Sequence, residues 1–442
     1  PIQQVISGFT AGKKYKVSFE ITELINGFIR VYSYVGASGT FTQVLATPSQ
    51  TGTYEVIFEF GGTNKNLFFY GNAGGGNFTG SIDNVSVKEY LGQEVVPDSG
   101  CGSWLWEPQS TNLIPYSNDY SQSVWRKRTS DSTQVPVITN NYAISPDGTQ
   151  NASRVVITKP STDNDYAVLD NYISVARSIG DKLTSTIYIK ANSSAQVGKE
   201  VNLYAYDGSY LTMITYALTD SWVRIDAVHT STTATSFMEA IVIGKARTSV
   251  GGVSLANMAT DFLISFAQLE NQSYATSYIP TDGTSVTRNQ DVCNNGGSLA
   301  SINSTEGVLY AEIAANSNDL TYRIFSINDG SRNNRVYLQY TNASNTLAAV
   351  VKSSNNTQAN MALVLSDETN FIKVGFKYKA NDFALWVNGV EVATDTSGLS
   401  PIGLNNLAFN DGTSNNFFGK TKCVAVWKEA LSDEELAELT TI

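Results

Sequence analysis

The feature that most constrains this chain is the alternation of apolar and polar side chains along many short segments. Residues 14 to 21 read KYKVSFEI and residues 54 to 60 read YEVIFEF, so every second residue is apolar. A period of two is typical of a β-strand with one face buried and the other in water. Because this pattern returns along the sequence with turn residues between the segments, we predict an all-β protein.

Length and composition limit the number of domains and their partners. The chain has 442 residues, and a single core stops growing at roughly 250 to 300 residues, so we expect two or three domains. Charged residues make up only 16%, whereas Tyr and Phe are abundant, which suits pleated, half-buried strands. The net charge of −11 disfavours a phosphate-binding surface, which needs clustered Lys and Arg. We expect no nucleic-acid partner.

The sequence contains no uninterrupted apolar run of about 18 residues, so we expect no membrane insertion. The first residues, PIQQVISGFT, lack the charged and apolar regions of a signal peptide. They resemble the middle of a strand-rich segment, and we expect further sequence to precede them.

Strand patterns recur in the same order in two parts of the chain. GKKYKVSFEI, FIRVYSYV, GTYEVIFEF, LFFYG and SIDNVSVKE in the first part correspond to GDKLTSTIYIKA, VNLYAYD, DSWVRIDAV, FMEAIVIG and DFLISFAQLE in the second. We interpret this order as a diverged repeat of one sandwich topology. The second copy is enlarged by loops and by a leading segment from Cys101 to about Ile157.

A third group of strand patterns, from GVLYAEIA to LAFN, has the short and regular spacing of a β-sandwich. Asn388-Gly389 predicts a two-residue hairpin turn, since a type I′ turn needs positive φ at both positions. The one convincing helix is the last, where Ser432 and Glu435 form a capping box. Its leucines are expected to close over the sandwich; they are Leu431, Leu436 and Leu439.

We therefore predict three consecutive β-sandwich (jelly-roll) modules with a short C-terminal helix. Patterned strands stop before two Gly-containing stretches and resume after them, which marks connectors between the modules. The predicted boundaries are a first sandwich at 1–90, a connector at 91–110, a second, larger sandwich of similar topology at 111–282, a connector at 283–298 and a third sandwich at 299–442.

Histidine and cysteine are too few for most catalytic or metal sites. His229 is the only histidine, and we expect a structural role for it at a strand end. Cys101, Cys293 and Cys423 lack the close spacing of a zinc site. Cys101 and Cys293 bracket the second sandwich, so a disulfide is an alternative to free thiols there.

Two similar segments in the third sandwich concentrate oxygen ligands. They read NDGSRNN at 328–334 and NDGTSNN at 410–416, each between two predicted strands. Asp329 and Asp411 are candidate calcium ligands, because Ca²⁺ binds carboxylate and amide oxygens. Asn-Asp-Gly also tolerates left-handed backbone and forms plain turns, which is the interpretation we favour. We therefore expect no cofactor, with calcium as the alternative.

Trp104, Trp106 and Trp125 lie in the irregular segment that leads into the second sandwich. They are candidates for a glycan platform or for a subunit contact. Trp104 and Trp106 flank Leu105 in a Gly-flanked strip, and exposed apolar strips usually mark contacts. We expect a neighbouring module or another subunit to cover this strip. Other tryptophans fall in strand patterns and are expected in a core or on a sheet; they are Trp222, Trp386 and Trp427.

Three segments of the chain resemble tail and fibre proteins of tailed bacteriophages. Residues 101–125, CGSWLWEPQSTNLIPYSNDYSQSVW, resemble a leading segment common in those proteins, and residues 270–293 resemble its partner segment. The sandwich between them resembles a carbohydrate-binding-module-like jelly roll, as does its repeat at 1–90. Residues 304–442 resemble the concanavalin A-like (laminin-G-like) lectin module of the same proteins.

This resemblance implies a non-enzymatic structural virion protein, a tail or head fibre or appendage exposed on the particle surface after assembly in the host cytoplasm. The implied partners are other virion proteins, further copies of the chain in a homo-oligomer such as a trimer, and cell-surface glycan that the appendage adheres to. Assembly in reducing cytosol favours free thiols at Cys101 and Cys293.

Two alternative functions remain open. One is a capsid or tail decoration or spacer protein with no ligand. The other is a polysaccharide depolymerase, which would need two carboxyl groups about 5 to 9.5 Å apart around the glycosidic bond. The 40 Asp and Glu residues always offer pairs, so their presence decides nothing.

Overall fold

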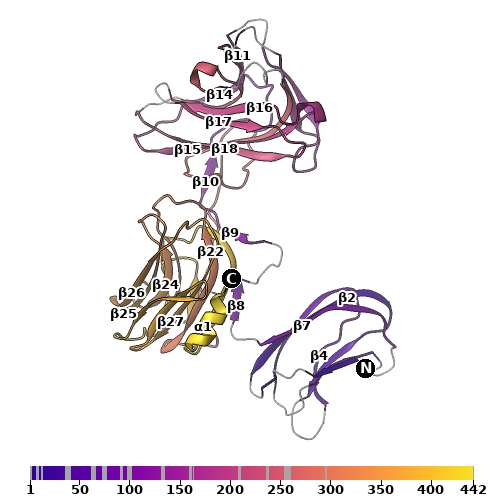
Figure 1. Cartoon of the computed structure of the whole chain (residues 1–442), viewed down its shortest axis with the longest axis vertical. Helices are drawn as coiled ribbons and strands as arrows, with labels where there is room; N and C mark the ends of the chain where they lie inside the picture. Colours follow the sequence, from indigo (N-terminus) through magenta and orange to yellow (C-terminus); the bar gives the residue numbers. More distant parts are fainter. Residues whose placement is uncertain are drawn as a thin grey trace.

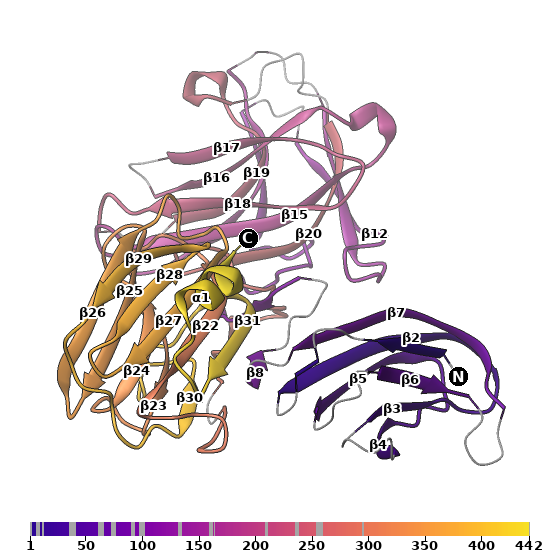
Figure 2. The same ribbon diagram turned by 60° about the horizontal axis from the view of Figure 1, so that its bottom comes forward.

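A computed structural model describes residues 2–5, 9–10, 13–34, 41–60, 66–71, 77–89, 93–96, 102–130, 135–158, 162, 164–207, 211–234, 238–252, 260–293 and 296–441. Cys101 lies outside the described residues. The chain is built almost wholly of β-strands in separate sandwiches (Figures 1 and 2), which confirms the predicted fold class. Within the described residues, no helix has the length and apolar character needed to cross a membrane.

The first sandwich packs two sheets around a core of aromatic and branched side chains. Its strands are β1 (Ile2–Val5), β2 (Lys14–Asn26), β3 (Arg30–Tyr34), β4 (Phe41–Ala46), β5 (Gly52–Glu59), β6 (Asn66–Tyr70) and β7 (Thr79–Glu89). One sheet has the order β1-β6-β3-β4 and the other β5-β2-β7. Phe19 of β2 and Phe69 of β6 meet edge to face between the sheets, with ring centroids 5.2 Å apart.

The second sandwich is larger. Its strands are β11 (Trp125–Thr129), β12 (Val137–Ala143), β13 (Ala152–Ile157), β14 (Ala167–Ile173), β15 (Lys182–Ala191), β16 (Glu200–Tyr206), β17 (Leu211–Ala217), β18 (Val223–Thr230), β19 (Met238–Lys245) and β20 (Thr260–Glu270), with short 3₁₀ turns η1 (Ser194–Gln196) and η2 (Thr248–Val250). The sheets have the orders β11-β14-β19-β16-β17 and β12-β13-β20-β15-β18.

The strand orders of the first two sandwiches correspond one to one. Strands β1-β6-β3-β4 match β14-β19-β16-β17, and β5-β2-β7 match β18-β15-β20. Five of these seven pairs are the segments whose sequence patterns recur in the same order; in the first sandwich they are β2, β3, β5, β6 and β7. The second sandwich adds β11 at one edge and β12 and β13 at another, so its enlargement comes from the segment that leads into it.

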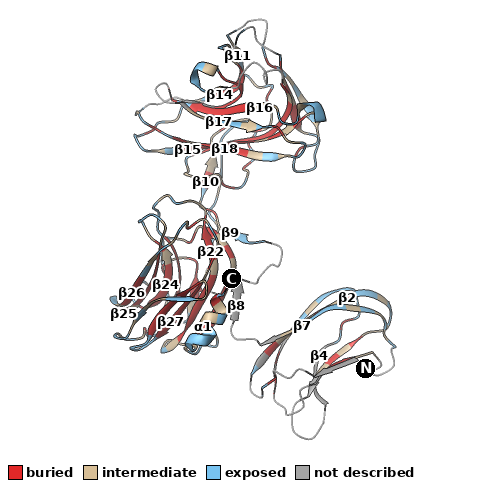
Figure 3. Ribbon diagram, in the orientation of Figure 1, coloured by how far each residue is buried: buried red, intermediate tan, exposed pale blue. Residues whose placement is uncertain are grey.

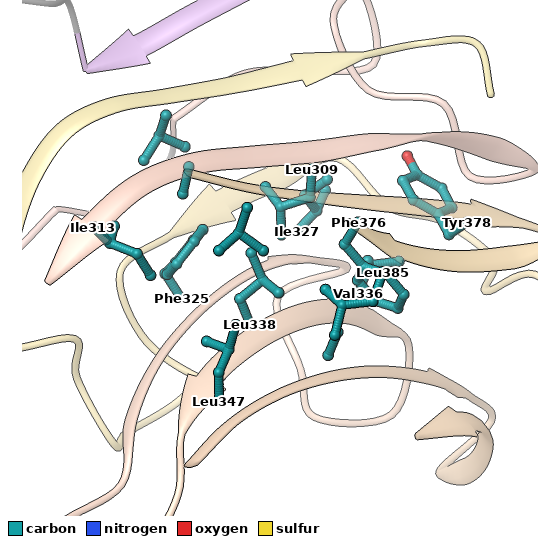
Figure 4. Packing of buried hydrophobic residues seen from close by; sticks show 14 of the residues in the cluster. Leu309, Ile313, Phe325, Ile327, Val336, Leu338, Leu347, Phe376, Tyr378 and Leu385 are labelled. Carbon is teal, nitrogen blue, oxygen red and sulfur yellow. The ribbon is translucent and has the colours of Figure 1, made fainter. Parts of the chain in front are cut away.

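The third sandwich packs two sheets around a large buried core. Its own strands are β22 (Glu306–Ala315), β23 (Arg323–Asn328), β24 (Arg335–Tyr340), β25 (Thr346–Ser353), β26 (Asn356–Val364), β27 (Ile372–Lys379), β28 (Phe383–Val387), β29 (Val390–Asp395), β30 (Asn406–Ala408) and β31 (Gly419–Trp427). One sheet runs β26-β25-β24-β23-β30, and the other includes β29-β28-β27-β22-β31. Figure 4 shows Leu309, Phe325, Leu338 and Phe376 interdigitating between them. Figure 3 shows that most of the buried residues lie on the strands.

The closing helix and the last hairpin form as the sequence predicts. Helix α1 (Asp433–Thr440) begins with a reciprocal capping box between Ser432 and Glu435. Leu436 is fully buried against Trp386 and Trp427, so the helix covers the outer side of one sheet. Asn388 and Gly389 have φ values of 51° and 84°, and the turn joins β28 to β29.

The expected connector at 91–110 is not a surface linker, because it contributes strands to the third sandwich. Strand β8 (Gln93–Val96) pairs with β31, and so does β9 (Trp104–Leu105). Trp106 exchanges two backbone hydrogen bonds with Gly419, of 2.8 and 3.1 Å. Its ring lies 4.6 Å from that of Phe409. The third sandwich therefore needs residues that precede the second one.

The expected connector at 283–298 also pairs. Strand β21 (Val286–Arg288) pairs with β10 (Ser110–Asn112), so the segments that enter and leave the second sandwich run antiparallel. Farther along, the backbone N–H of Phe409 donates to the carbonyl of Cys293. Cys293 packs on the third core, which therefore starts before the expected boundary at 299.

A fully buried amide holds the entering and leaving segments together. The Asn112 side chain donates to the carbonyls of Ala267 and Ile279 and accepts from the N–H groups of Ile114 and Leu269. All four hydrogen-bonding positions of the amide are used. The hydrogen bonds to protein therefore replace those to water, which offsets the desolvation cost of burying the amide. Asn112 therefore fixes the base of the second sandwich.

Two buried carboxylates extend this link. Glu107 accepts from the backbone N–H of Ser277 at 2.6 Å and pairs with Arg288. Glu270 accepts from Ser110 Oγ at 2.7 Å and from the backbone N–H of Thr276 at 3.0 Å. Glu107 is both ion-paired and hydrogen-bonded, and Glu270 is hydrogen-bonded, so neither buried carboxylate lacks partners. The second sandwich is thus anchored at both of its ends.

The position of Trp106 predicts a difference between neighbouring tryptophans. We expect Trp106→Ala to lower the stability of the third sandwich by about 2 to 4 kcal/mol, because it leaves a cavity against Phe409. Trp104→Ala is the matched control, since Trp104 is 48% exposed and should change stability by about 0.5 kcal/mol or less. Calorimetry of the whole chain measures both, and equal effects would contradict this packing.

Candidate functional site

A polar and aromatic hollow of the second sandwich lies on the outer face of sheet β11-β14-β19-β16-β17. Strand β16 explains why, because its side chains alternate between the two faces. Leu203 and Ala205 point into the core, whereas Tyr204 belongs to a separate outer cluster. Tyr206 is on the same outer face and is 38% exposed.

The register between neighbouring strands aligns one row of side chains on this outer face. Across the sheet, Arg126 lies opposite Asp170, Asp170 opposite Val242, Val242 opposite Tyr204, and Tyr204 opposite Met213. Residues directly opposite on neighbouring strands have Cβ atoms about 4.5 to 5.5 Å apart, so they interact. The row is therefore charged at the β11 edge and apolar toward β17.

The charged edge is held by one carboxylate beneath two guanidinium groups. The Asp170 side chain is fully buried; Arg128 Nε donates to it at 2.9 Å, and Arg126 pairs with its other oxygen. The Arg126 guanidinium also lies over the Tyr172 ring, 4.7 Å from the centroid. The cluster has a net positive charge and positions planar groups at the surface.

Next to this edge the face is hollowed into a pocket of about 420 Å³. It is lined by Arg128, Tyr166, Tyr204, Tyr206, Ala246, Arg247 and Val250. The Arg247 guanidinium lies 5.1 Å from the Tyr166 ring centroid. Tyrosine rings offer apolar faces and a polar end, and guanidinium groups donate in a fixed planar geometry. Such a lining suits a ligand with apolar C–H faces and many hydroxyl groups.

The three predicted contact tryptophans have different environments. Trp125 is only 4% exposed, packs in the second core and donates to the Tyr116 carbonyl at 2.8 Å, so it presents no contact surface. Trp106 is partly buried and packs against the core of the third sandwich. Trp104 stacks on Trp106 with the ring planes 15° apart and keeps an exposed face. A neighbouring module within the chain thus covers part of the strip.

The two Asn-Asp-Gly segments lie side by side. Arg332 of the first pairs with Asp411 of the second at 2.6 Å and also bonds Ser414. A Cβ on Gly412 would lie 2.4 Å from the Ser331 carbonyl oxygen, so the loops fit closely only with glycine there. Gly412 also has φ of 98°, which favours glycine.

The carboxylates of these loops are engaged by their own segments. Asp329 accepts from the backbone N–H of Ser331 and from Asn334 Nδ2, at 2.9 and 2.8 Å. Burial opposes ionisation of Asp411, yet the Ser414 N–H and the Arg332 guanidinium hold its pKa below the ordinary value. Within the described residues, no three His, Cys, Asp or Glu side chains gather as at a metal site.

His229 forms a buried chain of hydrogen bonds. Its Nδ1 lies 3.0 Å from Thr212 Oγ1 and its Nε2 lies 3.2 Å from Asp207 Oδ2. A hydroxyl, an imidazole and a carboxylate in sequence resemble a nucleophile triad, but the imidazole is fully buried. Burial lowers the pKa of His229 although Asp207 opposes this shift. The geometry is that of a structural histidine between two strands.

Cys293 is a half-buried free thiol, and burial raises its pKa. Because the thiolate is the reactive form, this shift makes the thiol less reactive at neutral pH. Its proposed disulfide partner, Cys101, lies outside the described residues.

The pocket was not predicted from the sequence, because only tryptophans were taken as candidate sugar platforms. The signal was present in VNLYAYD, where Tyr204 and Tyr206 are two residues apart and therefore on one face. Arg126 and Arg128 share the same spacing in β11. The sequence alone does not show which of the two faces of these strands points outward.

Comparison with protein families assigns the third sandwich. Residues 297–437 match the Laminin_G_3 family, described as the concanavalin A-like lectin/glucanases superfamily. This segment therefore has the predicted concanavalin A-like, laminin-G-like fold, although the match covers less than half of the chain. No curated protein matches the chain significantly.

Several solved structures are similar at low identity. Domain 4 of AbnA, an extracellular arabinanase of Geobacillus stearothermophilus in complex with arabinotriose, is 14% identical, with 38% of this chain and 81% of that chain covered and a TM-score of 0.27. Domains LG4-5 of mouse laminin α1 are 9% identical, with coverages of 59% and 90% and a TM-score of 0.23. The CBM22 tandem of Paenibacillus barcinonensis Xyn10C is 10% identical, with coverages of 61% and 82% and a TM-score of 0.24. Nothing about a ligand follows from similarity this low.

The engaged carboxylates lead to a prediction for calcium. We expect millimolar Ca²⁺ to shift the thermal midpoint of the whole chain by about 1 °C or less, because a ligand stabilises the fold only when it binds the folded state. Calorimetry with Ca²⁺ and with chelator measures this. A rise of several degrees that Asp329→Asn or Asp411→Asn abolishes would contradict the plain-turn interpretation.

Proposed function

We propose that the chain is a non-enzymatic structural protein of a tailed-phage virion, a tail or head fibre or appendage, and that it adheres to host-surface glycan. The observation that carries glycan binding is the pocket where Tyr166, Tyr204 and Tyr206 meet two guanidinium groups. The virion assignment rests on the resemblance of 101–125 and 270–293 to segments of phage tail and fibre proteins.

The composition of the pocket favours binding over hydrolysis. Glycoside hydrolysis uses a pair of carboxyl groups that flank the bond. The described residues that line the pocket include no Asp or Glu, and the nearby Asp170 is buried beneath two arginines. The pocket thus offers stacking faces and donors, which a binding site needs.

We also propose that the chain works as a homo-oligomer, with a trimer as the form that the phage resemblance implies. An open pocket of this size suits weak binding of a short saccharide, and several linked copies convert weak contacts into useful avidity. The solution mass of the whole chain tests this, and a monomer at all concentrations would count against it.

Binding should depend on the tyrosines of the outer face. On a glycan array, we expect Tyr206→Ala and Tyr166→Ala to weaken binding of the best glycan roughly tenfold each, about 1.4 kcal/mol, because a stacking face is lost. Tyr142→Ala is the matched control, since Tyr142 is 43% exposed but belongs to β12 in the other sheet.

Three outcomes distinguish the proposals. Selective loss in the two pocket variants supports the site. Equal loss in Tyr142→Ala would contradict it. Absence of binding to every glycan at millimolar concentration would instead favour a decoration or spacer protein without a ligand.

A further inference from the structure

We propose that the third sandwich carries a second saccharide site, specific for acidic sugars, on the outer face of strands β23, β24 and β25. This inference goes beyond the proposed function, since the site lies on another module and selects a different ligand class. Its location is a hollow of about 370 Å³ whose lining includes Tyr322, Arg332, Arg335, Tyr337 and Lys352.

The outer position of these side chains follows from the core. Val336 and Leu338 of β24 are buried between the two sheets, so Arg335 and Tyr337 point to the opposite face. Arg335 lies directly opposite Lys352 on β25, and Tyr337 lies opposite Val350. The Arg335 guanidinium lies over the Tyr337 ring, 4.3 Å from its centroid.

The cross-strand pairing of two cations is the first sign of a ligand. Like charges directly opposite each other destabilise a sheet. Arg335 and Lys352 occupy such a pair, and Arg332 adds a third cation from the first Asn-Asp-Gly loop. Asp411 is the one carboxylate among the lining residues, so the hollow carries a net charge of about +2 in a chain whose net charge is −11.

Within the described part of the chain, ion pairs do not fully neutralise the positive charges of this hollow. Asp411 is engaged by Arg332 at 2.6 Å, whereas Arg335 reaches its carboxylate only at 3.8 Å and bonds its backbone carbonyl at 2.7 Å. Lys352 makes no ion pair with any described residue. The excess charge is therefore concentrated at the Arg335 and Lys352 pair.

Burial of Arg335 is a second and independent sign. Its side chain is 9% exposed, and its Nε is buried with no hydrogen-bond partner among the described residues. A buried donor without a partner costs free energy, more so on a charged group. An anionic oxygen bound at the hollow would supply the missing countercharge.

The remaining lining indicates a saccharide as the carrier of the anion. Tyr322 and Tyr337 offer ring faces for the C–H side of a sugar, and Gln339 and Asn355 offer amides for hydroxyl groups. A carboxylate matches the planar guanidinium fork. A long polyanion such as nucleic acid would instead meet the negative charge of the rest of the chain.

The experiment compares acidic oligosaccharides with their own neutral forms. Oligogalacturonate, oligoglucuronate and α2,8-linked oligosialate are titrated into the whole chain by calorimetry, each beside its carboxyl-reduced form. We expect binding of at least one acidic oligomer, roughly tenfold weaker binding of its reduced form, and loss of affinity with rising salt.

Variants locate the site. Lys352→Gln should weaken the acidic oligomer about five- to tenfold, whereas Lys428→Gln, a change of the same charge at an exposed position outside the hollow, should leave it unchanged. Tyr337→Ala should also weaken it. Tyr206→Ala, in the other module, should have no effect, which separates this proposal from the one for the second sandwich.

Three results would overturn the inference. They are equal binding of acidic and reduced oligomers, equal loss in Lys352→Gln and Lys428→Gln, and no binding of any acidic oligomer at millimolar concentration. Tighter binding of an unrelated polyanion such as single-stranded DNA would also overturn it, because the site would then read charge alone.

Discussion

The two-residue period of the β-strand governs both the cores and the surfaces of this protein. Because Leu203 and Ala205 point into the core, Tyr204 and Tyr206 of the same strand point outward. In the same way, the inward position of Val336 and Leu338 places Tyr337 on the outer face. A shift of register by one residue would exchange the two sets of side chains. The packing of each core therefore holds the outer tyrosines and arginines in place without a dedicated loop. Rigid sheets are precise platforms for binding groups.

The path of the chain adds a second constraint. Strands β8 and β9 join the third sandwich before the chain forms the second one, and Trp106 packs on Phe409. The chain then returns along β21, which pairs with β10. The second sandwich is thus an insertion held at both ends, with Asn112 buried at its base. Attachment at two points restricts the motion that a single flexible linker would allow.

Much of the fold was predictable from local pattern. Alternation identified the strands, Asn388-Gly389 the hairpin and Ser432 the helix start, because each depends on residues close in sequence. The pairing of 93–96 and 104–105 with β31 was not predictable, since short strands at a sheet edge carry little pattern and their partner lies more than 300 residues away. The family resemblance indicated partner segments, and the structure adds how they are held: β10 pairs with β21, and the buried Asn112 amide bonds to Ala267 and Ile279.

The candidate sites were less accessible to sequence reasoning. Trp125 was a reasonable candidate by residue type, yet it lies in a core because its side chain points inward from the edge strand β11. Asp411 was recognised as an oxygen ligand, whereas its pairing with Arg332 depends on two loops that meet only in the fold. Arg335 and Lys352 are seventeen residues apart in sequence and adjacent only through register. Such groupings are properties of strand pairing, which the sequence pattern leaves open.

The proposed binding of glycan to the outer face of sheet β11-β14-β19-β16-β17 can be tested by a crystal structure of the whole chain with the oligosaccharide that binds it best. We expect a sugar ring stacked on Tyr166 or Tyr206, within hydrogen-bond reach of Arg128 or Arg247. A saccharide bound instead at Trp104, with the pocket on the outer face empty, would contradict it.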